Sequence, residues 1–228
     1  MKWKIMTTPE LKQSLTWLML AGLIGFLVTA VFSMQLHWHR SLFLVPYITI
    51  IGTFLGVYFY KQPISLKQLL GHWRMGLVGT AIATLFLIWK VHTYPASAVP
   101  EGMQLVWATL WIGITYGIVD GLLLNVMPVL LVQRLWTDQA STSRSTLLSR
   151  GLLALLASIF VTIAYHLGYT EFHGLSMLWV IVGNSIITAT YLLTRSPLSA
   201  ILTHVIMHIA AVFHGMETVL MLPPHYVI

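Results

Sequence analysis

The sequence has 228 residues, of which 57% are hydrophobic and only 8% are charged. Soluble domains contain about 25% charged residues, so this composition excludes an ordinary soluble domain and indicates several spans in a lipid bilayer. The formal net charge of +6 fits a basic rim beside anionic lipid headgroups and requires no nucleic acid partner. The absence of cysteine excludes disulfides and thiolate metal sites. No polar stretch is long enough to build a second domain, so we expect a single membrane domain over residues 1–228.

Seven apolar segments are long enough to cross the hydrocarbon core of a bilayer, which takes roughly 20 helical residues. They cover about 15–36, 41–60, 75–92, 103–133, 149–170, 175–194 and 197–222. The first is too long for the core of a signal peptide, so we expect a retained span. The fourth is the longest, and Gly113, Gly117, Gly121 and Pro128 are positions where it can bend or divide. We therefore predict an all-α polytopic bundle of seven transmembrane helices, or eight if the fourth segment divides.

Lysine and arginine are distributed unequally between the two sides of this topology. Basic residues collect in the cytoplasmic loops of membrane proteins. With a cytoplasmic N-terminus, only Arg40 and Lys90 lie on the outer side. The other ten lie inside: Lys2, Lys4, Lys12, Lys61, Lys67, Arg74, Arg134, Arg144, Arg150 and Arg195. The bias predicts a cytoplasmic N-terminus.

Four ionisable residues, Asp120, His166, His204 and His208, fall deep within predicted spans. Such residues are costly in a bilayer and usually face a cavity with a function. Counted from the nearest cytoplasmic arginine, they lie 14, 16, 9 and 13 residues into their spans. At the rise of an α-helix these separations become roughly 21, 24, 14 and 20 Å of depth. We therefore expect the four side chains to meet at a similar level.

His204 and His208 are four residues apart and project from the same face of one helix. Two imidazoles at this spacing can bind one metal ion, and a carboxylate from elsewhere often completes such a site. The same pair is also compatible with two histidines that are hydrogen-bonded to neighbouring helices. Asp120 and His166 at similar depth favour a functional site.

The stretch "GNSIITATYLLTRSPLSAILTHVIMHIAAV", residues 183–212, resembles the last two motif-bearing helices of the CPBP family. This family contains the membrane-embedded CAAX proteases and bacteriocin-processing enzymes. His204 falls on the family histidine, and His208 falls where the family has asparagine.

Two further stretches resemble motifs of the same family. The stretch "SIFVTIAYHLGY" resembles the F-x-x-x-H helix, with His166 on the histidine and Thr162 in place of phenylalanine. The stretch "YGIVDGLLLNVMPVL" resembles the E-E-x-x-x-R segment. Asp120 stands there for the first glutamate, Gly121 for the second and Asn125 for the arginine. The order and spacing of the motifs agree with the family over about residues 105–212.

The resemblance implies an intramembrane endopeptidase in a bacterial cytoplasmic membrane, acting on a membrane-associated peptide or a prenylated protein. It assigns Asp120 and His166 to the activation of water and His204 and His208 to stabilising the oxyanion. Because His208 adds an imidazole to the set, the four residues also suit Zn²⁺ or another divalent metal.

Two other functions use the same residues. The first is a catalytically inactive CPBP-like scaffold or immunity protein, which Gly121 and Asn125 favour because a carboxylate and a charge of the family are missing. The second is a metal- or proton-handling membrane protein or carrier, with bis-histidine haem ligation as a variant.

Small and aromatic residues support more general expectations. The pairs Ala21/Gly25 and Gly113/Gly117 have the spacing for close helix packing, which allows a homodimer. Tryptophans and tyrosines near span ends are typical of interfacial belts.

Overall fold

The structure is a computed structural model that describes residues 8–135, 143–216 and 222–223. Over these residues the chain forms helices and no strand. The elements in chain order are α1 (Thr8–Thr29), η1 (Ala30–Gln35), α2 (Arg40–Lys61), α3 (Leu66–Leu69), α4 (Trp73–His92), α5 (Gly102–Ala108), η2 (Thr109–Tyr116), α6 (Gly117–Asp120), η3 (Gly121–Val126), α7 (Met127–Arg134), α8 (Arg144–His166), η4 (Thr170–Phe172), α9 (Ser176–Thr194) and α10 (Pro197–His214).

Seven helical stretches of the described chain are long and apolar enough to cross a membrane. They are Glu10–Gln35, Arg40–Lys61, Trp73–His92, Gly102–Arg134, Arg144–His166, Ser176–Thr194 and Pro197–His214. All seven overlap the segments expected from hydropathy, although several ends differ: the fifth, for example, runs over Arg144–His166 and was predicted over 149–170. The last helix ends at His214, whereas the predicted span ran to residue 222, and residues 217–221 of that prediction lie outside the described part.

The fourth stretch, α5 to α7, runs as one helix of 33 residues and does not divide into two. It contains two π-helical segments, η2 and η3, which flank the single turn α6. The wider turns of a π-helix occur frequently at functional sites. Asp120 is the last residue of α6, so it lies between the two wider segments.

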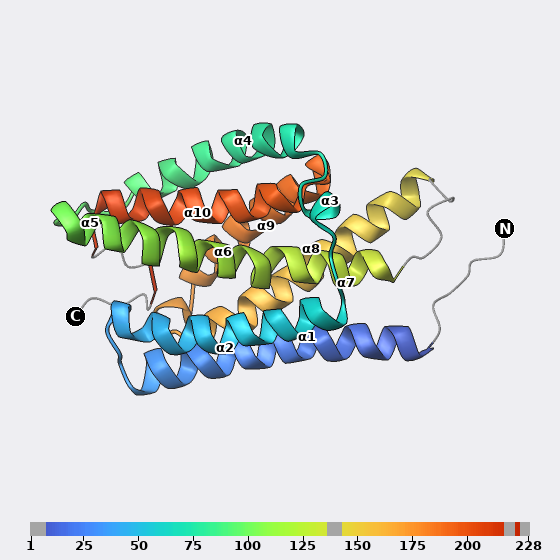
Figure 1. Ribbon diagram of the computed structural model, residues 1–228, viewed down its shortest axis with the longest axis horizontal. Coiled ribbons are helices and arrows are strands. Elements are labelled where there is room, and N and C mark those ends of the chain that lie inside the picture. The colour runs from blue at the N-terminus through green and yellow to red at the C-terminus, as the bar shows by residue number, and fades with distance from the viewer. Residues whose placement is uncertain (1–7, 136–142, 217–221, 224–228) are drawn as a thin grey trace.

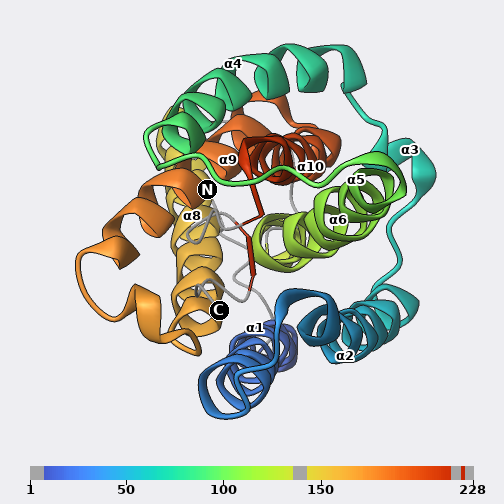
Figure 2. The ribbon, with the colours of Figure 1, turned by 90° about the vertical axis from the view of Figure 1, so that its left-hand side faces the viewer.

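The helix from α5 to α7 and α10 form the interior of the bundle. Of the residues in the apolar part of each helix, 72% are buried in the helix from α5 to α7 and 61% in α10, against 28–39% in the other five stretches. Figure 2, which looks along the bundle, shows α6 beside α10 with α4, α9, α8, α1 and α2 around them. The two helices that carry Asp120, His204 and His208 are therefore the most enclosed.

Glycines allow these two central helices to approach unusually closely. A Cβ atom on Gly117 would lie 2.8 Å from the Cα of Val205, and one on Gly121 would lie 2.9 Å from the Cα of Ile201. Because both neighbours are backbone atoms, no rotamer change could relieve the contact. The close approach brings α6 against the histidine-bearing part of α10. It also explains why a glutamate side chain does not fit at position 121.

The small residues considered for a homodimer pack within the chain. A Cβ on Gly113 would lie 2.7 Å from Ile209 of α10. A Cβ on Gly25 of α1 would contact Tyr165 of α8 at 3.5 Å. The predicted close helix packing is thus used inside one chain. The homodimer itself stays a prediction, without support from these two pairs.

Consecutive spans run in opposite directions, so the basic residues gather at one end of the bundle (Figure 1). The helix ends and loops there carry Lys12, Lys61, Lys67, Arg74, Arg134, Arg144, Arg150 and Arg195. Arg40 and Lys90 lie toward the other end. Lys2 and Lys4 lie outside the described residues. The asymmetry used to predict a cytoplasmic N-terminus therefore has a structural counterpart, and the orientation stays a prediction.

Candidate functional site

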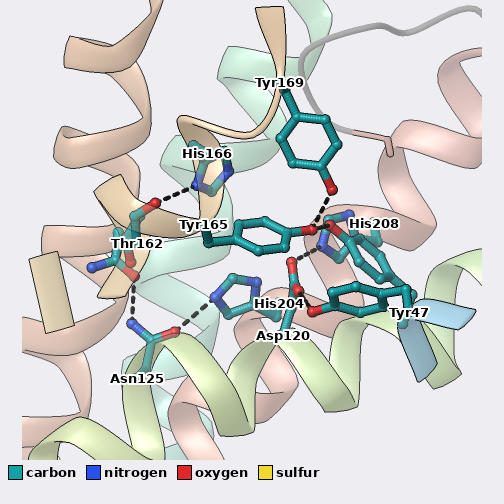
Figure 3. A network of polar contacts seen from close by, with 11 residues as sticks. Tyr47, Asp120, Asn125, Thr162, Tyr165, His166, Tyr169, His204 and His208 are labelled. Carbon is teal, nitrogen blue, oxygen red and sulfur yellow. Dashed lines mark hydrogen bonds and ion pairs between the residues drawn. The ribbon is translucent and has the colours of Figure 1, made fainter. Parts of the chain in front are cut away.

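Three of the four residues singled out in the sequence converge in the centre of the bundle (Figure 3). Asp120, His204 and His208 each offer a potential ligand atom, and these atoms all lie within 4.8 Å of one another. The three residues are only 3%, 4% and 2% exposed. We refer to them as the Asp–His–His cluster.

The geometry of the Asp–His–His cluster is close to that of a metal site. Two ligands that are each about 2.0–2.1 Å from a tetrahedral zinc lie roughly 3.3 Å apart. His208 Nε2 lies 3.7 Å from Asp120 Oδ2, so this pair needs to close by only about 0.4 Å to fit that geometry. The widest pair, at up to 4.8 Å, needs a movement of at most about 1.5 Å.

His204 is held in a defined orientation by Asn125. Its Nε2 lies 2.7 Å from the Asn125 carbonyl oxygen Oδ1, which can only accept, so Nε2 carries the proton and donates. The lone pair of the neutral ring is then on Nδ1, which is buried and has no hydrogen-bond partner within the described chain. An unpaired buried nitrogen is costly. His204 therefore presents an unsatisfied potential ligand.

A buried polar network fixes Asn125 in turn. The Asn125 amide donates to Asn184 Oδ1 and Thr188 Oγ1, both at 2.8 Å, and Asn184 donates to Ser158 Oγ at 2.9 Å. Ser158 donates to the Leu124 carbonyl at 2.5 Å. Because the amide nitrogen is committed to these acceptors, the carbonyl faces His204. An arginine here would offer only donors and could not accept from His204.

The two oxygens of Asp120 have different neighbours. Oδ1 accepts a hydrogen bond from the Tyr47 hydroxyl at 2.5 Å, and Oδ2 faces His208. Tyr47 comes from α2 and is fully buried. A carboxylate with one oxygen engaged by a tyrosine is oriented to present the other oxygen to an ion.

His166 does not belong to the group of atoms within 4.8 Å. Its Nδ1 donates to the Thr162 carbonyl at 2.8 Å, and its ring packs edge-on against Tyr165 and Phe172, each at 4.8 Å between centroids. It nevertheless lines the same cavity as the cluster. The four predicted site residues are thus arranged as three potential ligands and one separate histidine.

Tyrosines near the cluster were missed by the sequence reasoning, which considered tyrosines only near span ends. The hydroxyls of Tyr116, Tyr165 and Tyr169 form a row, with separations of 2.8 Å and 2.7 Å. All three side chains are buried. Their sequence positions held a signal: Tyr116 precedes Asp120 by one helical turn, and Tyr165 directly precedes His166.

A cavity of about 80 Å³ opens beside the cluster. Since one water needs about 10–15 Å³ of such cavity volume, the cavity has room for several waters or a small chemical group. Asp120, His166, His204 and His208 lie on its wall, and most of the remaining wall is apolar. Lys90, Tyr94 and Trp179 also line it, and the Lys90 ammonium lies 3.8 Å from the Trp179 ring centroid.

Tyr94 lies outside the membrane-spanning helices, in the segment that follows α4. Burial raises the pKa of its hydroxyl above the ordinary value, because the charged form is less well solvated there. Tyr94 therefore contributes a neutral hydroxyl to the wall of the cavity at neutral pH.

The chain matches no family model, and no curated protein or solved structure matches it. The resemblance to the CPBP family therefore depends on the three quoted stretches alone.

Proposed function

We propose that the protein is a membrane-embedded, metal-dependent hydrolase that cleaves a peptide bond in a membrane-associated protein or peptide. The convergence of Asp120, His204 and His208 on one buried point carries this proposal. Catalytic zinc sites typically have three protein ligands of these types and leave a further position for water or substrate. The adjacent cavity provides the space that such a position requires.

The donor set suits Zn²⁺ or a similar divalent ion. One hard carboxylate and two imidazoles of intermediate softness form a donor set that zinc accepts, and the described part of the chain offers no thiolate. Among the described residues, His204 Nδ1 has no hydrogen-bond partner, and an ion would provide one. A divalent ion bound there would polarise a substrate carbonyl and make a water molecule more acidic.

His166 has the properties of a general base beside this centre. Because its Nδ1–H donates to the Thr162 carbonyl, the neutral ring accepts protons at Nε2. In hydrolysis the water oxygen forms a bond to the carbonyl carbon, and His166 takes the water proton. When the carbon–nitrogen bond breaks, His166 returns the proton to the leaving amine. The products are a carboxylic acid and an amine, which exchange a proton to become a carboxylate and an ammonium.

Support from the sequence is the match in order and spacing to the CPBP motifs, in which His166 has the same task, the activation of water. Asp120, which the resemblance assigns to water activation, is a metal ligand in this proposal. The assignment of His204 and His208 differs from that implied by the resemblance. A histidine that donates its Nε2–H to Asn125 has no second N–H for an oxyanion when neutral, so His204 fits a ligand better than an oxyanion donor.

Metal content and cleavage together test the proposal. We expect purified wild-type protein to contain about one zinc per chain by elemental analysis, because the three ligands form one site. Asp120→Ala, His204→Ala and His208→Ala should each lose most of it. His39→Ala, which removes an exposed histidine at the start of α2, should retain it.

Cleavage is measured by comparing the termini of membrane peptides in cells that produce the wild-type protein or His166→Ala. We expect new termini only with the wild type, while both proteins bind zinc. A folded wild-type protein without metal would refute the metal site. A zinc-containing protein that yields no new termini would indicate a scaffold or metal-handling protein instead.

A further inference from the structure

The row of buried tyrosine hydroxyls begins beside the Asp–His–His cluster. The ring of Tyr116 lies 4.7 Å from the ring of His208, and Tyr116 lines the cavity. Its hydroxyl lies 2.8 Å from that of Tyr165, which lies 2.7 Å from that of Tyr169. The three tyrosines come from η2, the end of α8 and the segment after it, so the row connects separate elements.

The three hydroxyls carry three protons and form two hydrogen bonds with one another. One hydroxyl proton is therefore not needed for the bonds within the row. Each hydroxyl can donate once and accept twice. An anionic oxygen in the cavity beside Tyr116 would orient the row so that Tyr169 donates to Tyr165, Tyr165 to Tyr116 and Tyr116 to the anion. Hydrogen bonds in such a chain polarise and strengthen one another.

The proposed reaction needs a donor of this kind. Attack of water on a carbonyl places negative charge on its oxygen, and fixed donors in a buried site stabilise that charge. His204 uses its N–H on Asn125, and His208 faces Asp120. Tyr116 lines the cavity, and its ring lies 4.7 Å from the ring of His208, so it is a neutral donor beside the cluster.

We infer that the Tyr116 hydroxyl donates a hydrogen bond to an oxyanion bound beside the cluster, with Tyr165 as a positioning residue. This inference, which rests on the proposed metal-dependent hydrolase, assigns an oxyanion subsite to the cavity. Its ligand class comprises carboxylates, hydroxamates and the tetrahedral form of an amide, all of which place a negative oxygen beside the metal. Neutral acceptors gain less from this donor than anions do, and cationic groups gain nothing.

Acetohydroxamic acid, which releases a proton to the buffer and binds zinc through oxygen as the hydroxamate anion, tests the subsite without a substrate. Its affinity for zinc-containing protein is measured by calorimetry in detergent, with zinc content and melting temperature recorded for each variant. We expect Tyr116→Phe to weaken binding about tenfold or more, as expected for loss of a hydrogen bond to a charged group. Tyr165→Phe should weaken it less, because it removes only the polarising neighbour.

Tyr191→Phe is the matched control, since Tyr191 is a buried tyrosine in α9 that does not line the cavity. It should leave acetohydroxamate affinity unchanged. Equal affinity of wild type and Tyr116→Phe, at equal zinc content, would overturn the inference while leaving the metal site intact. If Tyr116→Phe lowers only zinc content or melting temperature, the hydroxyl is structural and the inference is wrong. Absence of zinc from the wild type would overturn both proposals.

Discussion

Replacement of Asn125 perturbs the cluster without touching any proposed ligand. Asn125→Leu keeps the size of the side chain and removes both its acceptor and its donors. The Nε2–H of His204 then loses the acceptor that lies 2.7 Å away, and Asn184 and Thr188 lose bonds of 2.8 Å. His204 is no longer held with its Nδ1 lone pair toward the cluster.

Two magnitudes follow from these contacts. Loss of an outer-shell partner of a metal-bound histidine typically weakens metal binding about 10- to 100-fold, which corresponds to about 1.4–2.7 kcal/mol. Each buried polar group left unpaired costs a further 1–3 kcal/mol or so of folding stability. We therefore expect Asn125→Leu to weaken zinc binding about 10- to 100-fold and to lower the melting temperature.

Asn125→Asp separates the two effects. A carboxylate retains an acceptor for the His204 Nε2–H but cannot donate to Asn184 or Thr188. We expect it to lose stability while keeping zinc affinity within about threefold of the wild type, which is below the tenfold expected from outer-shell loss. Zinc affinity is measured by competition with a chromophoric chelator. Unchanged zinc affinity in folded Asn125→Leu would refute the assignment of His204 Nδ1 as a ligand.

Two other substitutions test the fold around the site. Gly117→Ala places a Cβ 2.8 Å from the Val205 backbone, so it should separate the central helices, lower the melting temperature and reduce zinc content. Gly52→Ala, with open space around it, should have none of these effects. Burial raises the pKa of Glu171, in η4, so ionisation of this carboxyl opposes folding. The stability therefore falls as pH rises from the unfolded-state pKa to the folded-state pKa. Glu171→Gln should therefore raise the melting temperature at neutral pH but not in acid, and an equal shift at both pH values would contradict this cause.

The sequence was sufficient to predict the helices and the level of the site, because both follow from length and rise. Counting residues placed Asp120 and His208 at depths of roughly 21 and 20 Å. In the structure His208 Nε2 lies 3.7 Å from Asp120 Oδ2. Counting does not give rotation about the helix axis. His166, at a similar predicted depth, therefore lies apart from the cluster, on Thr162 and Phe172.

Other features depend on packing between distant segments. Asn125 looked like the loss of a family arginine, because only the fold shows that His204 needs an acceptor there. Gly113 and Gly117 looked like points of bending or dimerisation, but both contact α10 within the chain. Tyr47 and Tyr116 enter the core because α2 and η2 face the cluster, and no local pattern in the sequence fixes that arrangement.

X-ray absorption spectroscopy at the zinc edge tests the Asp–His–His centre most directly. In the purified wild-type protein we predict a shell of nitrogen and oxygen at about 2.0–2.1 Å that includes two imidazoles, from His204 and His208. His204→Ala should reduce the imidazole contribution or abolish binding, and His166→Ala should leave the spectrum unchanged. Zinc with no imidazole ligand, or an imidazole contribution that depends on His166, would contradict the proposed centre.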